Sequence, residues 1–137
     1  MQHFTLGADP ELICRRNGQF VPAHNFFKSN SSCGLDGNES VFEIRGFYDE
    51  SVIDLTSKIY QVLDYAHDKA PDLEFIAGNF VDNFPIGGHT HLSIDPLPEV
   101  IDALDVVLGS FSNCIDDKLQ RQKRERSGYG KKGAYRR

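Results

Sequence analysis

Three short segments of the sequence hold side chains of the kinds that bind cations and phosphates. In order along the chain, these side chains are Asp9, Glu11, Glu43, Arg45, His89, His91 and Ser93. Carboxylates that lie close together repel one another, and a cation between them relieves the repulsion. Oxygen ligands suit Mg²⁺ or Mn²⁺, and Mn²⁺ tolerates one imidazole more readily than Mg²⁺ does. If the three segments meet in the fold, they therefore predict a cation site.

Each segment also has an ordinary explanation when it is considered alone. A turn such as Asp9-Pro10-Glu11 is commonly just solvated, and Glu43 with Arg45 can form a weak ion pair on an exposed strand face. A His-x-His pair on a strand occurs both with and without a ligand. Three segments that each give one face to ligand-type residues favour a shared site over three unrelated surfaces.

The alternation of residue types predicts how these side chains are displayed. In the strand predicted over residues 40–46, Glu43 and Arg45 share one face, while Phe42 and Ile44 share the other. Because the apolar face goes to the core, we expect Glu43 and Arg45 to point at solvent or into a polar site.

The same two-residue alternation predicts the strand that carries the two histidines. Over residues 87–95 it places His89, His91 and Ser93 on one face. We expect Asp9 at a turn over residues 7–10, which interrupts a strand that starts at residue 3 and resumes at residue 11.

Helical periodicity accounts for most of the remaining chain. It predicts one helix over residues 49–69 and a second that begins near Pro98 and runs past Leu119. Residues 16–19 are typical of a hairpin turn, and residues 24–39 of a long loop.

The order of the elements predicts the fold class. A short strand is expected over residues 73–79, and the glycines of the basic segment 121–137 favour a loop rather than continued helix. Strands, a helix, strands and a second helix together predict an α+β domain with a mostly antiparallel sheet.

Length and composition allow one ordinary globular domain. The chain has 137 residues and a net charge of −5, with no apolar stretch long enough for a membrane helix and no signal-like N-terminus, so we expect a cytoplasmic protein. Residues 1–117 carry a net charge of −13 and residues 118–137 a net charge of +8. The acidic body suits a cation, and the basic end suits phosphates or the body's own carboxylates. The three cysteines are widely spaced and are expected to be reduced.

Four segments, taken in their order, carry a resemblance to a known family. They are GADPEL (7–12), DGNESVFEIR (36–45), GGHTHLSID (87–95) and RERSGYGKKGAYR (124–136). The chain resembles the amidoligases of the glutamine-synthetase-like fold, in particular the phage-associated carboxylate–amine ligase (type 2) group. The resemblance covers essentially the whole chain, and its third segment and Tyr-Gly-x-x-Gly-x-Tyr-Arg end are the most specific parts. It implies a glutamine-synthetase-like α+β domain over residues 1–120, with residues 121–137 as a basic loop that contacts nucleotide or substrate.

The resemblance also implies a role for each candidate residue. The metal ligands would be Asp9, Glu11, Glu43 and His89. The nucleotide contacts would be His91 and Ser93, with Arg124 or Arg126 on the phosphates. Arg136 would hold the transferred phosphoryl group, and Arg45 would contact the substrate carboxylate.

The implied reaction is ATP-dependent and ADP-forming. A phosphoryl group passes from ATP to a carboxylate, and an amine then attacks the acyl phosphate. Metals and arginines supply the neutralising charge that such a transfer needs. The expected cofactors are ATP with Mg²⁺ or Mn²⁺, and the expected partners are small-molecule or peptide carboxylates and amines, in the host cytoplasm if a phage encodes the chain.

Three other functions compete with the ligase. Family members normally continue beyond the Tyr-Arg motif into further strands with another Glu and Arg, whereas this chain stops at Arg137. The first alternative is therefore a short, catalytically incomplete binding or assembly module, whose open sheet edge a second copy or a partner chain would complete. The second is a cupin-type metalloprotein, which the absence of a Glu shortly after His91 disfavours. The third is nucleic-acid binding through residues 118–137, which we do not expect because no base-reading motif accompanies the charges.

Overall fold

The computed structural model describes residues 4–30, 32–36, 39–78, 80–95, 97–115 and 117–127. The chain divides into two compact units, Met1–Ser93 and Ile94–Arg137, and each is described by itself.

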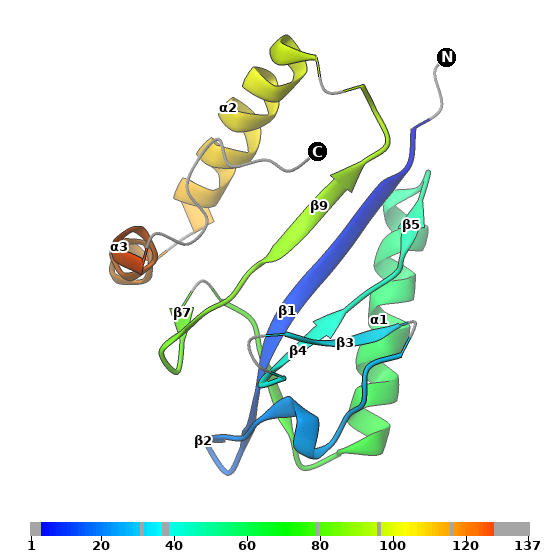
Figure 1. The fold of residues 1–137 in the computed structure, drawn as a ribbon, viewed down its shortest axis with the longest axis vertical. Helices are drawn as coiled ribbons and strands as arrows, with labels where there is room; N and C mark the ends of the chain where they lie inside the picture. The colour runs from blue at the N-terminus through cyan, green and yellow to red at the C-terminus, as the bar shows by residue number, and fades with distance from the viewer. Residues whose placement is uncertain are drawn as a thin grey trace. The chain divides into compact units, whose positions relative to one another are not determined.

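The first unit is an antiparallel sheet built around one long strand, β1 (Leu6–Arg16) (Figure 1). The first half of β1 pairs with β5 (Tyr48–Asp49) on one edge and with β9 (Gly88–Leu92) on the other. Its second half pairs with β4 (Val41–Ile44), β6 (Glu74–Ile76) and β2 (Gln19–Phe20). The strand β3 (Cys33–Asp36) extends the sheet beyond β4. This arrangement confirms the predicted α+β class and its antiparallel sheet.

The expected turn over residues 7–10 is wrong, because β1 continues through it. On the β9 edge, Pro10 is paired with Gly88. On the opposite edge it lies between Leu6–Gly7, which pair with β5, and Glu11–Leu12, which pair with β4. A proline removes a backbone donor, and at this change of partner the missing donor interrupts neither ladder.

The expected loop over residues 24–39 is also partly wrong, because it contains a short 3₁₀ helix (Ala23–Asn25) at its start and strand β3. The Asn30 side-chain oxygen accepts hydrogen bonds from the amides of Ser32 and Cys33, both 2.8 Å long, and so turns the chain into β3. The sequence Cys-Gly-Leu-Asp lacks the β-branched residues that mark a strand, so its pattern does not predict β3.

The hairpin between β1 and β2 confirms the prediction for residues 16–19. Asn17 and Gly18 have φ values of 53° and 74°, as a two-residue turn of the type that joins twisted strands requires.

One face of the sheet packs against the helix α1 (Val52–Lys69), which confirms the helix predicted over residues 49–69. Ser51 caps its start by accepting a hydrogen bond from the Asp54 amide. The apolar side of α1 meets the even-numbered side chains of β1 and β4 in the main core. This core includes Leu12, Cys14, Phe42, Ile44, Val62 and Ala66. Burial raises the pKa of the Cys14 thiol to about 12. Cys14 and Cys33 are both buried free thiols, and the side chain of Cys114 lies outside the described residues.

The opposite face of the sheet is divided between a small apolar cluster and polar residues. The cluster consists of Ile13, Val41 and Ile86, all buried. A hairpin formed by β7 (Phe80–Val81) and β8 (Phe84–Pro85) covers it, and Phe84 stacks on Phe20 with ring centroids 4.9 Å apart. Asp82, in the turn of this hairpin, accepts two hydrogen bonds from the Arg15 guanidinium, each 2.7 Å long.

The second unit contains two helices, α2 (Pro98–Ile115) and α3 (Lys118–Ser127). The start of α2 at Pro98 is as predicted, but the continuous helix past Leu119 is wrong. Asp117 begins a new helix, since its side chain accepts a hydrogen bond of 2.8 Å from the Leu119 amide. The loop expected from residue 121 is helical as far as Ser127. The segment Lys118–Ser127 is rich in strong helix formers and contains no glycine, so it needs no apolar stripe to form a helix.

In the part of the chain that the structure describes, no helix combines the length and apolarity that crossing a membrane would require.

Candidate functional site

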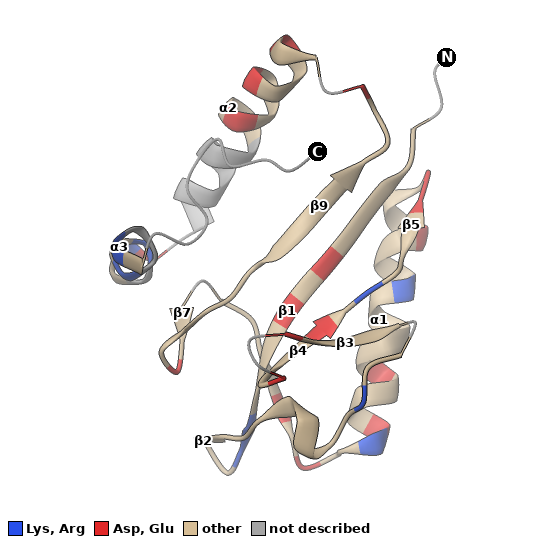
Figure 2. Ribbon diagram, viewed as in Figure 1, with Lys and Arg blue, Asp and Glu red and all other residues tan. Residues whose placement is uncertain are grey.

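Glu11 and Glu43 lie directly opposite each other on β1 and β4. The Glu11 amide donates to the Gly87 carbonyl on the other edge of β1, at 2.8 Å. Glu11 and Glu43 therefore form a non-hydrogen-bonded pair, the arrangement that brings opposite side chains closest together. Figure 2 shows acidic positions of β1 and β4 side by side in the middle of the sheet.

Asp36, at the end of β3, completes a group of three carboxylates with Glu11 and Glu43. One oxygen from each side chain lies within 4.8 Å of the other two. The register explains the grouping: Gly34 pairs with Glu43, and Asp36 lies two residues further along the same face. We call Glu11, Asp36 and Glu43 the carboxylate group.

Two of these three carboxylates are almost completely buried. Glu11 is 4% exposed and Glu43 is 6% exposed. Burial, followed by the negative charges of Asp36 and Glu43, raises the pKa of Glu11, while a hydrogen bond from the Gly87 amide opposes this rise. That amide lies 2.9 Å from Glu11 Oε2 and holds the carboxylate in one orientation. Buried, mutually repelling carboxylates are the kind of donor set that a hard divalent cation stabilises.

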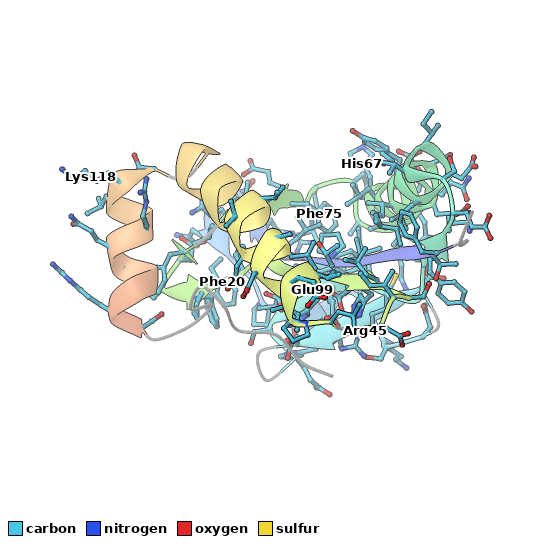
Figure 3. All side chains as sticks on the ribbon, turned by 90° about the horizontal axis from the view of Figure 1, so that it is seen from above. Phe20, Arg45, His67, Phe75, Glu99 and Lys118 are labelled. Atoms are coloured by element: carbon cyan, nitrogen blue, oxygen red, sulfur yellow. The ribbon has the colours of Figure 1, made fainter. Side chains whose placement is uncertain are left out.

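Arg45 lies beside the carboxylate group and balances part of its charge. Its Nε donates to Glu43 Oε2, and one of its terminal nitrogens lies 3.3 Å from the Leu35 carbonyl oxygen. Figure 3 shows Arg45 on the side of β1 away from His67 of α1, in agreement with its place on the polar face. Glu43 and Arg45 therefore point into a polar site rather than freely into solvent.

Asp9 connects the two histidines of β9 to β1. The register pairs Asp9 with His89 and Gly7 with His91. Asp9 Oδ1 accepts a hydrogen bond from the His89 amide and lies 3.2 Å from His89 Nδ1, while Asp9 Oδ2 lies 3.0 Å from His91 Nε2. A carboxylate in this position orients both imidazoles.

The predicted metal residues thus fall into two neighbouring groups on one face of the sheet. Glu11 and Glu43 belong to the carboxylate group, whereas Asp9, two residues before Glu11 on β1, contacts His89. From the sequence pattern, Asp36 falls only within the loop expected over residues 24–39. The pairing of β3 with β4 brings Asp36 close to Glu43, although the two residues are seven positions apart in the sequence.

Ser93 makes backbone contacts just beyond the end of β9. Its hydroxyl oxygen accepts a hydrogen bond of 2.6 Å from the Thr5 amide, and its own amide donates to the Thr5 carbonyl at 3.1 Å. These bonds hold the start of β1 against the chain that follows β9.

A pocket of about 380 Å³ adjoins both groups. Its lining includes Asp9 of β1, Glu43 of β4 and His91 of β9, together with Arg45, just after β4, and Tyr48 of β5. A cavity of this size holds a small molecule, and the wall offers both negative and positive side chains to it.

The whole sequence was compared with known protein families. The family described as phage phiEco32-like COOH·NH2 ligase type 2 matches residues 6–137. The chain belongs to this family. The match confirms the resemblance to the carboxylate–amine ligases and supports a ligase of this broad class. No curated protein and no solved structure matches the chain.

The basic residues expected on nucleotide phosphates lie in the second unit of this COOH·NH2 ligase-type chain. Arg126 is exposed on α3. The side chain of Arg124 and the whole of Arg136 lie outside the described residues.

Proposed function

We propose that this chain is an ATP-dependent carboxylate–amine ligase that binds a divalent cation at the carboxylate group. The observation that carries the proposal is the meeting of Glu11, Asp36 and Glu43 beside a small-molecule pocket, in a chain of the COOH·NH2 ligase family. We also infer that the sheet is of the glutamine-synthetase-like type, which the antiparallel pairing of acidic strands around β1 supports.

The residues of the site suit Mg²⁺ or Mn²⁺. Three carboxylates from three adjacent strands offer hard oxygen ligands, and two of them are too buried to be stabilised well by water. Asp9 and His89 form a neighbouring pair that could hold a second cation. A bound cation would neutralise the oxygens of the transferring phosphate.

The reaction has two steps, which balance without any further reactant. A carboxylate oxygen of the substrate forms a bond to the γ-phosphorus of ATP, and the bond from that phosphorus to the ADP oxygen breaks. The nitrogen of an amine then forms a bond to the acyl carbon, and the bond from that carbon to the phosphate oxygen breaks. The products are an amide, ADP, inorganic phosphate and the proton that the amine loses.

The chain's own side chains have separate tasks in this scheme. The pocket holds the carboxylate substrate near Arg45, whose planar guanidinium matches a carboxylate. Asp9 fixes the orientation of His91, which we place on the nucleotide side of the pocket. Holding the reacting groups in line is the main contribution that a protein makes to phosphoryl transfer.

Separation of the nucleotide products tests the proposal. The protein is incubated with ATP, Mg²⁺ and pools of carboxylates and amines, and the expected result is ADP and phosphate formed only when both pools are present. Glu43→Gln should abolish turnover, whereas Asp64→Asn, which removes an exposed charge on α1, should not change it. Formation of AMP and pyrophosphate would contradict the acyl phosphate route. Metal-dependent ATP binding without turnover in any pool would instead favour the incomplete binding module.

A further inference from the structure

We propose that Arg45 is an internal counter-ion of the carboxylate group that a divalent cation displaces, and that its displacement readies the pocket for an anionic substrate. The inference rests on the proposed function and adds an order of binding to it, with the cation before the carboxylate.

Arg45 and a cation would use the same oxygen donor. The Arg45 Nε donates to Glu43 Oε2, and Glu43 is one of the three residues whose oxygens converge within 4.8 Å. A carboxylate oxygen that accepts a hydrogen bond from a guanidinium has less negative charge to offer a metal ion, and the guanidinium repels an approaching cation.

Strand β3 provides the space and a hydrogen-bond acceptor that keep the Arg45 guanidinium beside Glu43. Arg45 lies across β3 at Gly34, and a Cβ atom added at Gly34 would overlap its guanidinium. The Leu35 carbonyl accepts a further hydrogen bond from it. The absence of a side chain at Gly34 therefore gives the guanidinium its place beside Glu43.

The Arg45 side chain can also adopt an orientation towards the pocket. The side chain of Arg45 is 43% exposed, whereas that of Glu43 is buried. Arg45 also lines the pocket together with Tyr48 and His91. When a cation takes over the charge of Glu43, the guanidinium can turn towards this pocket without leaving a buried carboxylate uncompensated. An anionic group in the pocket is then its natural partner.

Calorimetry with Mn²⁺ on the full chain tests the competition. Arg45→Gln removes the competing charge and should bind Mn²⁺ about tenfold more tightly than the wild type, the effect expected of a lost charged hydrogen bond. Gly34→Ala keeps the charge but displaces the guanidinium, so its affinity should lie between these two. Arg16→Gln is the matched control, because it removes the same charge from an exposed pair with Asp72. Its affinity should stay within about twofold of the wild type.

Two results of this titration would overturn the inference. Mn²⁺ affinity in Arg45→Gln that is equal to or weaker than that of Arg16→Gln would show that Arg45 supports the cation or has no effect on it. If the wild type bound no divalent cation at all, the proposed function itself would fail. The titration therefore distinguishes a wrong role for Arg45 from a wrong cation site.

The signal of the Arg45 Nε–H group in ¹⁵N spectra tests the release. The signal is assigned by its loss in Arg45→Lys. Its chemical shift should change when Mg²⁺ is added to the wild type. Acetate, used as a simple carboxylate probe at constant ionic strength, should move it further only when Mg²⁺ is present. No response to Mg²⁺, or an equal response to acetate with and without Mg²⁺, would overturn the ordered binding.

Discussion

Glu11 and Glu43 face each other across β1 and β4, and both side chains are almost fully buried. Like charges placed directly opposite each other destabilise a sheet, and burial increases the effect. The raised pKa of Glu11 has the same origin, since burial and the charges of Asp36 and Glu43 act on it. The arrangement is therefore unfavourable for the cation-free fold and favourable for a chain that binds a cation there.

Glu11→Gln should make the cation-free protein more stable. Glutamine keeps an oxygen that can accept the Gly87 amide hydrogen and removes the repelled charge, so the free energy of unfolding should rise by about 1 kcal/mol. Urea denaturation in the presence of a chelator measures it. Asp64→Asn serves as the control for a charge removed from an exposed site on α1. A variant less stable than the wild type would show that the Glu11 charge is already well compensated without a cation.

The Arg15–Asp82 pair should make the stability of the protein depend on pH in the acid range. The hydrogen bonds from Arg15 lower the pKa of Asp82 from its ordinary value of 3.8. Since this carboxylate is ionised more readily in the folded protein, its contribution is complete above pH 3.8 and is lost as the pH falls through the lowered value. Asp82→Asn should therefore have a Tm roughly 1–4 °C lower at pH 6, and the two proteins should converge at low pH.

The matched control for this prediction is Asp72→Asn, which breaks the more exposed ion pair with Arg16. Its effect on the Tm should be smaller, because exposed ion pairs contribute little. A Tm difference for Asp82→Asn that stays constant from pH 6 down to pH 2 would contradict the assignment. Thermal unfolding over a series of pH values gives both results.

Gly88→Ala should disturb the contact between β9 and β1. A Cβ atom at Gly88 would lie 2.9 Å from the Pro10 Cα and 3.1 Å from the Asp9 carbonyl oxygen, and neither backbone atom can move away easily. We expect a loss of about 1–3 kcal/mol in the free energy of unfolding, as for other overpacked positions. Thr90→Ala, at an exposed position on the same strand, should cost less than half of this. Equal losses in the two variants would contradict the close approach.

The local parts of this fold could be predicted from the sequence because their signals are local. The hairpin at Asn17–Gly18 depends on two residues with positive φ, and α1 shows its apolar period and its cap within one segment. The alternation around Glu43 correctly predicts that it lies on the face opposite Phe42 and Ile44, although Glu43 is more buried than a solvent-facing residue would be.

The parts that could not be predicted depend on pairing between distant segments. From the sequence alone, Pro10 is expected to interrupt β1. Only the pairing of β1 with β5 and β4 on one edge and with β9 on the other shows why the strand continues through it. The amide that orients Glu11 belongs to Gly87, which is 76 residues away in the sequence. Asp36 joins the site only through the pairing of β3 with β4, and Cys33–Asp36 carries no strand pattern of its own.

The most direct test of the account is the affinity of the wild type and of Asp36→Asn for Mn²⁺, measured by calorimetry on the full chain. Asp36 is exposed, so its replacement should leave the fold intact, and circular dichroism can confirm this. We expect Asp36→Asn to bind Mn²⁺ at least about tenfold more weakly than the wild type, because it loses one charged ligand of three. The affinity of Asp64→Asn should be unchanged. Equal Mn²⁺ affinity in the wild type and in Asp36→Asn would contradict the claim that Glu11, Asp36 and Glu43 together hold a cation.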